Sequence, residues 1–205
     1  MTSPGRPPRR VGVPGGPAGA SRASSGGPDP KWLQSSRKHA SGLTGRYRES
    51  VVDYTGSGHK RINKWLRRGQ IPGDTSVAAA VKDIDTVLAK NKLPQTTHLT
   101  RVVSLSKAFQ LTGGADLETK VAGKLRTEDG FMSTSRRPEF DMEDIADPVV
   151  LDVIAPAGTP AAAIEDISKV PRQYEILLGR DLDYVIREPW YDQNAGVWRA
   201  TLRIL

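Results

Sequence analysis

The sequence predicts an α+β fold in which N-terminal helices pack on a mixed, mainly antiparallel β-sandwich core. Apolar residues recur at helical spacing between about residues 32 and 91. From about residue 98 onward, short β-branched and apolar segments follow one another as a series of strands. Helices first and strands afterwards are typical of the α+β class.

Two helices are expected before the first break in the helical pattern. One begins at Trp32 or Leu33 and ends before Gly42, where a glycine follows the last periodic residue. The second covers residues 46–55, because its apolar residues are spaced four and three apart on one face. The glycines and hydroxyls of residues 55–58 then interrupt the pattern.

Two more helices follow this break. Ser57 is the expected N-cap of a helix over residues 58–68, which ends in two arginines and a glycine. Asp74 or Thr75 caps the next helix, over residues 76–91, whose apolar stripe faces the core.

The second half of the chain reads mainly as strands. The first covers residues 97–105 and contains Arg101 between β-branched residues. A mixed stretch follows, with a helix expected over 116–125. The remaining strands are expected at residues 131–134, 149–155, 161–165, 174–178, 184–188 and 197–205.

The formal charge of +7 lies at the N-terminal end. Residues 1–48 hold nine Lys/Arg and one Asp, whereas the rest holds 21 bases and 22 acids. Residues 1–30 also contain seven Pro, seven Gly and four Ser, a composition that cannot bury enough apolar surface to offset its ordering entropy. We predict a disordered, basic leader over residues 1–30 and one folded domain over residues 31–205.

Composition excludes several classes of protein. No run of about 18 apolar residues is present, so no membrane span is predicted. The N-terminus lacks the apolar core of a classical signal peptide. The sequence has no cysteine, and its three histidines (His39, His59 and His98) lie far apart, so neither disulfides nor a metal site is expected.

Three polar motifs stand on predicted strands. Arg101 lies in an apolar strand, the hydroxyls Ser133, Thr134 and Ser135 follow an apolar strand start, and Gln173 precedes Glu175 by two residues. Because residues two apart on a strand share a face, Gln173 and Glu175 are expected to point the same way. Each motif alone is also compatible with an ordinary solvated strand end.

Together and in this order, the three motifs resemble those of toxin-type mono-ADP-ribosyltransferases. This family includes clostridial binary-toxin components, Rho-modifying exoenzymes and pierisin-like enzymes. The Gly130–Ser135 segment is similar to the family's strand motif, and residues 62–67 resemble the helix that cradles NAD. The resemblance covers about residues 48–190 and implies an NAD cleft within the α+β fold, with no metal.

The resemblance assigns roles to particular residues. Glu175 is implied as the carboxylate that stabilises an oxocarbenium-like state, Gln173 as the residue that positions the acceptor, and Ser133 as the hydroxyl that holds Glu175 or the nicotinamide ribose. The implied NAD-binding residues are Arg101, Thr134, Ser135, Tyr54, Asn63, Arg67 and Phe140. Either Arg136 or Arg137 is a candidate for a second phosphate-binding arginine.

A neutral glutamine at position 173 implies a neutral acceptor. In the family this residue accompanies asparagine side chains of small GTPases or guanine bases, so DNA, RNA and a host protein all stay open as acceptors. Hydrolysis of free NAD is the expected side reaction. We expect a monomer that acts as a secreted or delivered effector in a target cell.

The alternative is a noncatalytic protein that binds nucleic acid. Its basic leader would contact phosphates or another anionic surface nonspecifically, with a strong dependence on salt. This alternative requires nothing of Ser133, Gln173 or Glu175.

Overall fold

The computed structural model describes residues 26–205 apart from 71–72, 138–141, 143–144 and 171–172. Most of the predicted leader, and Phe140, therefore lie outside the described residues. Gly26 already contacts the domain, because its carbonyl accepts a hydrogen bond of 2.7 Å from the backbone N–H of His98.

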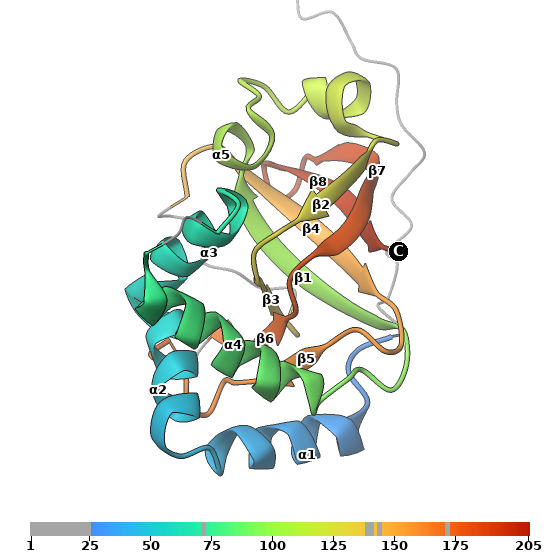
Figure 1. The fold of residues 1–205 in the computed structure, drawn as a ribbon. Helices are drawn as coiled ribbons and strands as arrows, with labels where there is room; N and C mark the ends of the chain where they lie inside the picture. The colour runs from blue at the N-terminus through green and yellow to red at the C-terminus, as the bar shows by residue number, and fades with distance from the viewer. Residues whose placement is uncertain (1–25, 71–72, 138–141, 143–144, 171–172) are drawn as a thin grey trace, which may run out of the picture.

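Four helices form one layer of the molecule (Figure 1), namely α1 (Pro30–Ser41), α2 (Gly45–Asp53), α3 (His59–Arg67) and α4 (Thr75–Ala89). The side chain of Asp29 caps α1, and that of Asp74 caps α4 by accepting the Val77 N–H at 3.1 Å. These carboxylates satisfy backbone donors that a helix N-terminus otherwise leaves unpaired. The helices expected from apolar spacing are thus confirmed, with Asp74 as the cap of the last one.

The expected break between the second and third helices takes another form. The chain continues as a wide π-helical turn, η1 (Tyr54–Gly58), which is kinked at Gly56 (φ −95°, ψ −134°). Gly58 stands at the N-cap position of α3, and no side chain caps that helix. The prediction of Ser57 as N-cap was wrong, because the non-helical residue is Gly56 and the chain is already helical again at Gly58, the residue before α3.

Within the described residues, eight strands form a mixed sheet in the order β2-β7-β8-β4-β1-β3-β6-β5, and only the β4–β8 pair is parallel. Their bounds are β1 (Thr97–Ser104), β2 (Leu125–Glu128), β3 (Met132–Ser135), β4 (Pro148–Ala155), β5 (Ala161–Ala163), β6 (Glu175–Leu178), β7 (Leu182–Asp192) and β8 (Val197–Ile204). The mixed, mainly antiparallel sheet expected from the sequence is confirmed.

The stretch between β1 and β3 differs most from expectation. It contains a short helix, α5 (Leu105–Phe109), a π-helical turn, η2 (Leu117–Val121), and the edge strand β2. The helix expected over 116–125 is therefore shorter, and it ends where Gly123 adopts a positive φ of 75°. Strand β2 was not predicted, because it is short and exposed, with Leu125 at 65 % exposure.

The sheet bends between β1 and β3, where a single pair, Thr100↔Ser135, joins the two strands. Apolar side chains from both halves meet in one core cluster, including Leu99 and Leu151 from one half and Met132 and Ile176 from the other. A second cluster lies between the helices and the other face of β3, β5 and β6, and includes Phe131 and Leu177. The sheet is thus folded over a core, as a sandwich, with the helices covering one half.

Candidate active site

Glu175 and Ser133 meet on neighbouring strands although they are 42 residues apart in sequence. Strands β3 and β6 pair with Ser135 opposite Glu175 and Ser133 opposite Leu177. Ser133 and Glu175 are therefore diagonal neighbours on the same face of the sheet. The Ser133 hydroxyl donates a hydrogen bond to Oε1 of Glu175, which is only 4 % exposed.

Ser168 is a second hydroxyl at the same carboxylate, and the sequence motifs did not include it. Its Oγ donates to Oε2 of Glu175 at 3.4 Å and accepts the backbone N–H of Val170 at 3.1 Å. Each carboxylate oxygen thus contacts a different serine. The signal in the sequence was that Ser168 is the only hydroxyl residue of the loop before Gln173.

Burial raises the pKa of the Glu175 carboxyl. The hydrogen bonds from Ser133 and Ser168 oppose this rise, as do the nearby charges of His59 and Arg101. Loss of solvent disfavours the anion, whereas the hydroxyl donors and cations favour it. The site therefore holds a carboxylate whose ionisation depends on its immediate neighbours.

Gln173 does not share a strand face with Glu175. Strand β6 begins at Glu175, and the intervening Tyr174 has a positive φ of 49°, so the alternation of faces does not extend back to Gln173. Gln173 is exposed, whereas Glu175 is buried. The two side chains lie at the same strand start, but the geometric reason given for their proximity was wrong.

Arg101 reaches across the bend of the sheet. Its Nη1 donates to the backbone carbonyl of Ser133 at 2.9 Å, so the guanidinium lies next to the strand that carries the serine. A guanidinium has five N–H donors, so most of its donors remain for a ligand. Arg101 is therefore placed to bind an anionic group close to Glu175.

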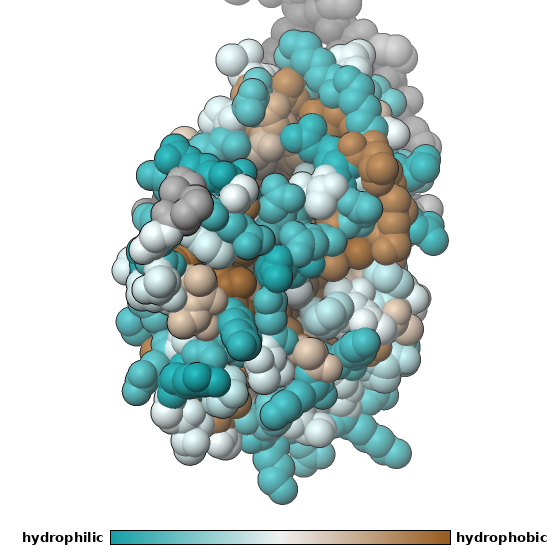
Figure 2. Space-filling model, viewed as in Figure 1, coloured by the Kyte–Doolittle hydropathy of each residue, from teal (hydrophilic) through white to brown (hydrophobic). Residues whose placement is uncertain are grey.

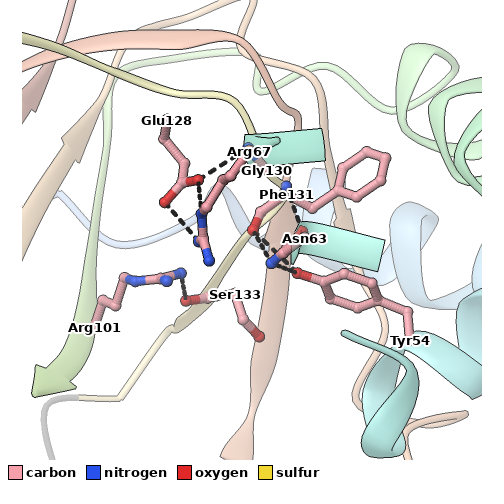
Figure 3. A network of polar contacts seen from close by, with 8 residues as sticks. All are labelled: Tyr54, Asn63, Arg67, Arg101, Glu128, Gly130, Phe131 and Ser133. Atoms are coloured by element: carbon pink, nitrogen blue, oxygen red, sulfur yellow. Dashed lines mark hydrogen bonds and ion pairs between the residues drawn. The ribbon is translucent and has the colours of Figure 1, made fainter. Parts of the chain in front are cut away.

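Arg67 lies at the end of α3 and pairs with Glu128. The Nε and Nη2 atoms of Arg67 donate to the two carboxylate oxygens of Glu128, each at 2.9 Å. Oε1 of Glu128 also accepts the backbone N–H of Gly130 at 2.9 Å. Figure 3 shows the guanidinium groups of Arg67 and Arg101 on the same side of the Gly130–Ser133 segment. No sequence motif pointed to Glu128.

Tyr54 and Asn63 use their polar atoms on the protein itself. The Asn63 amide holds the Phe131 residue on both sides, accepting its N–H at 3.0 Å and donating to its carbonyl at 3.1 Å. The Tyr54 hydroxyl donates to the same carbonyl at 3.0 Å (Figure 3). Tyr54 is 2 % exposed and Asn63 is 6 % exposed. These contacts give both side chains a role in fixing β3 against the helices, and their expected contact with NAD stays a prediction.

Thr134 and Ser135, the other two hydroxyl residues of the strand motif, also form hydrogen bonds within the protein. Thr134 is buried and donates to the Ile176 carbonyl at 2.6 Å, which ties β3 to β6. Ser135 is also buried, and its hydroxyl accepts the Arg137 N–H at 3.1 Å. Both hydroxyls thus bond within the protein, and their expected contact with NAD stays a prediction. Phe140 lies outside the described residues.

Neither a metal cluster nor a membrane helix is found in the part of the chain that the structure describes. No three His, Asp or Glu side chains there are grouped so that they could hold a metal ion. No helix there is long and apolar enough to cross a bilayer.

Comparison with solved structures places this fold in the class of ADP-ribosylating toxins. An ADP-ribosyltransferase toxin from Paenibacillus larvae, Plx2a, is 25 % identical and superposes with a TM-score of 0.73 over 85 % of this chain and 94 % of its own. An ADP-ribosyltransferase from Clostridium botulinum is 27 % identical, with a TM-score of 0.68 over 85 % of this chain and 92 % of its own. The C3 exoenzyme of Clostridium limosum is 22 % identical, with a TM-score of 0.71 over 85 % and 92 %. A search of curated protein sequences finds no significant match.

The family model of the ADP-ribosyltransferase exoenzymes matches residues 30–198. The chain therefore belongs to the ADP-ribosyltransferase exoenzyme family, and its substrate is NAD. The resemblance read from the motif order is confirmed.

Proposed function

We propose that this enzyme transfers ADP-ribose from NAD to a neutral nucleophile on a macromolecule, with Glu175 as its catalytic carboxylate. The observation that carries this proposal is the buried Glu175 carboxylate, held by one serine on each oxygen beside Arg101. A carboxylate in such a preorganised, largely dry setting can stabilise positive charge that develops on a sugar ring.

The bond that breaks joins C1′ of the nicotinamide ribose to the pyridinium nitrogen. Its electron pair leaves with neutral nicotinamide, and C1′ acquires oxocarbenium character, as in glycoside hydrolysis. The Glu175 anion accepts a hydrogen bond from the ribose and stabilises the positive charge. An acceptor then attacks C1′ and loses a proton, and water in its place yields free ADP-ribose.

Arg101 is the residue that we assign to the pyrophosphate. A guanidinium suits this role because its planar donors match phosphate oxygens. Arg67 is a second candidate, although its Nε and Nη2 atoms already donate to Glu128. For Arg67 to bind a phosphate, it must use its remaining donors or exchange Glu128 for the ligand.

The exposed Gln173 supports a neutral acceptor. An amide can hydrogen-bond to an uncharged nitrogen nucleophile, whereas a carboxylate at this position would favour a guanidinium. Guanine in nucleic acid and a neutral protein side chain such as that of asparagine both meet this requirement. The toxin relatives support a delivered effector that acts on a target-cell macromolecule.

Replacement of Glu175 by glutamine tests the assignment of the catalytic carboxylate. Glu175→Gln keeps the shape of the side chain but cannot carry the negative charge, and its amide nitrogen must donate to one of the two serines instead of accepting from it. We expect NAD hydrolysis, followed as nicotinamide release, to fall by about 100-fold or more. The matched control is Glu118→Gln, an exposed carboxylate on η2, which should retain wild-type activity. Undiminished turnover in Glu175→Gln would refute the assignment, and absence of turnover in the wild type would refute the proposed activity.

The acceptor class follows from one labelling experiment. The protein is incubated with NAD labelled in its adenylate moiety and with a cell lysate. Separate samples are then treated with protease, DNase or RNase. The treatment that releases the label from precipitable material identifies whether protein, DNA or RNA is modified.

A further inference from the structure

Tyr174, which lies between Gln173 and Glu175, has an unusual backbone conformation. Its φ of 49° lies in the left-handed region, which aromatic residues seldom adopt. Such a conformation is disfavoured for a residue with a Cβ atom, and it persists only where the surroundings hold it. The turn at Tyr174 separates Gln173 from strand β6, which begins at Glu175.

Arg136 contacts Tyr174 through both its backbone and its side chain. The Arg136 N–H donates to the Tyr174 carbonyl at 3.2 Å, which extends the β3–β6 pairing by one residue. Its guanidinium carbon lies 4.7 Å from the centre of the Tyr174 ring, and that of Arg137 lies 3.7 Å from it. Guanidinium groups at these distances attract an aromatic ring.

A buried carboxylate in turn fixes the Arg136 side chain. Its Nε and Nη2 atoms donate to the two oxygens of Glu165 at 3.1 and 3.3 Å. The Glu165 side chain is 6 % exposed, and it also pairs with Arg37 of α1 at 3.1 Å. Arg37 in turn binds Asp166, at the start of the loop that carries Ser168. Arg136 is therefore held on one side and holds Tyr174 on the other. Because Glu165 accepts from its Nε and Nη2, we assign Arg136 to this contact and keep only Arg137 as the candidate for a second phosphate-binding arginine.

Glu175 has supports of its own that do not involve Arg136. Its carbonyl accepts the Ile164 N–H at 3.1 Å, and its side chain is bonded to Ser133 and Ser168. Loss of Arg136 would thus loosen the turn that carries Gln173 more than it would displace the carboxylate. The two halves of the reaction, bond cleavage and transfer, depend on different supports.

We propose that Arg136 is a positioning residue that acts through Tyr174 to fix Gln173, and so sets the share of ADP-ribose that reaches the acceptor rather than water. This inference rests on the proposed roles of Gln173 and Glu175. The Arg136–Glu165 pair is thereby a determinant of transfer, although it does not touch the reacting atoms.

The test compares two rates in the same variants. Nicotinamide release reports NAD cleavage without an acceptor, and incorporation of labelled ADP-ribose into precipitable lysate material reports transfer. We expect Arg136→Ala to lower transfer by about 10-fold or more and NAD hydrolysis by less than about 3-fold, since misplacement of a bound reactant commonly costs up to about 100-fold. Gln173→Ala should show the same pattern.

The matched control is Arg180→Ala. Arg180 pairs with Asp85 at 3.1 Å and is 25 % exposed, against 23 % for Arg136, but it lies beyond the opposite end of β6. Its loss should leave the ratio of transfer to hydrolysis unchanged. A general structural effect of deleting a paired arginine would alter both variants alike and would overturn the inference.

Two variants of the ring keep the proposal testable if Arg136→Ala does not fold, which its thermal unfolding midpoint would reveal. Tyr174→Phe keeps the ring that the guanidinium groups contact and should retain the wild-type ratio. Tyr174→Ala removes the ring and should lower the ratio as Arg136→Ala does. Equal losses of transfer and hydrolysis, or an unchanged ratio in Tyr174→Ala, would overturn the inference while leaving the proposed function intact. A wild-type protein without NAD hydrolysis would instead refute the function itself.

Discussion

Individual side chains at the site divide into those that face the carboxylate and those that hold the protein. Ser133, Glu175 and Arg101 were found from motif order, and the structure brings them together around one strand. Tyr54 and Asn63 were expected from the same family resemblance, but their buried polar atoms bond to Phe131. A sequence motif marks residues that must be kept, and it does not distinguish contact with a substrate from support of the strand beneath it.

Replacement of Ser133 by alanine is expected to shift the pH dependence of NAD hydrolysis. The hydrogen bond from Ser133 lowers the pKa of Glu175 against the raising effect of burial. Because the proposed mechanism uses the Glu175 anion, loss of that bond should move the acid limb of kcat/KM for NAD to higher pH. Ser76→Ala, at an exposed hydroxyl on α4, is the control and should keep the wild-type profile. An acid limb that moves to lower pH would contradict this account.

The same pKa has a consequence for stability. A glutamate whose pKa is raised in the folded state binds its proton more tightly there than in the unfolded chain. Its contribution to stability therefore falls as pH rises from the ordinary value of 4.5 through the raised value. Ionisation of Glu175, which the proposed mechanism requires, therefore lowers the stability of the fold.

At the scale of elements, the contact between α3 and the start of β3 fixes the position of β3, the strand that carries Ser133. The Asn63 amide binds both backbone groups of Phe131, the residue directly before β3. The Phe131 side chain is fully buried in the cluster beneath the helices. Position and orientation of the strand start are therefore set by one amide and one ring.

Asn63→Ala should destabilise the protein by about 1–3 kcal/mol, because it leaves a buried N–H of Phe131 without its partner. Urea unfolding measures the change. Asn91→Ala is the matched control, since the Asn91 amide makes one local bond of 3.1 Å to the Val87 carbonyl, and its cost should be smaller. Equal losses of unfolding free energy in the two variants would show that the Phe131 contact has no special weight.

Periodicity predicted the elements whose apolar faces are buried, and it missed those that are not. The stripe of α4 and the apolar runs of β4 and β6 left clear patterns, because each buries a face. The short edge strand β2 alternates exposed and half-buried residues and fully buries neither face, so it has no such pattern. The pairs Arg67–Glu128 and Arg136–Glu165 join residues 61 and 29 positions apart, so only the tertiary fold reveals them.

At the scale of the whole molecule, the excess positive charge does not identify the acceptor. It belongs mostly to residues 1–48, and the remainder carries 21 bases against 22 acids. Figure 2 shows a face that is largely hydrophilic, with hydrophobic residues gathered toward one side, near β7. The family match begins at residue 30, where α1 begins. That residues 1–30 are a disordered leader stays a prediction.

Two truncated chains separate the leader from the domain. A chain that begins at Gly26 keeps Asp29, whose Oδ1 accepts the Trp32 N–H at 2.8 Å, and should hydrolyse NAD at the wild-type rate. A chain that begins at Pro30 loses this helix cap and should be less stable by about 1 kcal/mol. Thermal unfolding and nicotinamide release measure both effects. If the chain that begins at Gly26 loses NAD hydrolysis, the leader is part of the catalytic unit.

The bend between β1 and β3 makes the molecule mechanically anisotropic. β1 pairs with β4 along its whole length, whereas only Thr100↔Ser135 joins β1 to β3. Pulling β1 away from β4 would break a full ladder of backbone hydrogen bonds, whereas pulling β1 away from β3 would break few. The Arg101–Ser133 bond spans the same junction and works as a side-chain tether. A ligand that drew Arg101 away from Ser133 would release this tether and leave the two halves of the sheet joined by the Thr100↔Ser135 pair.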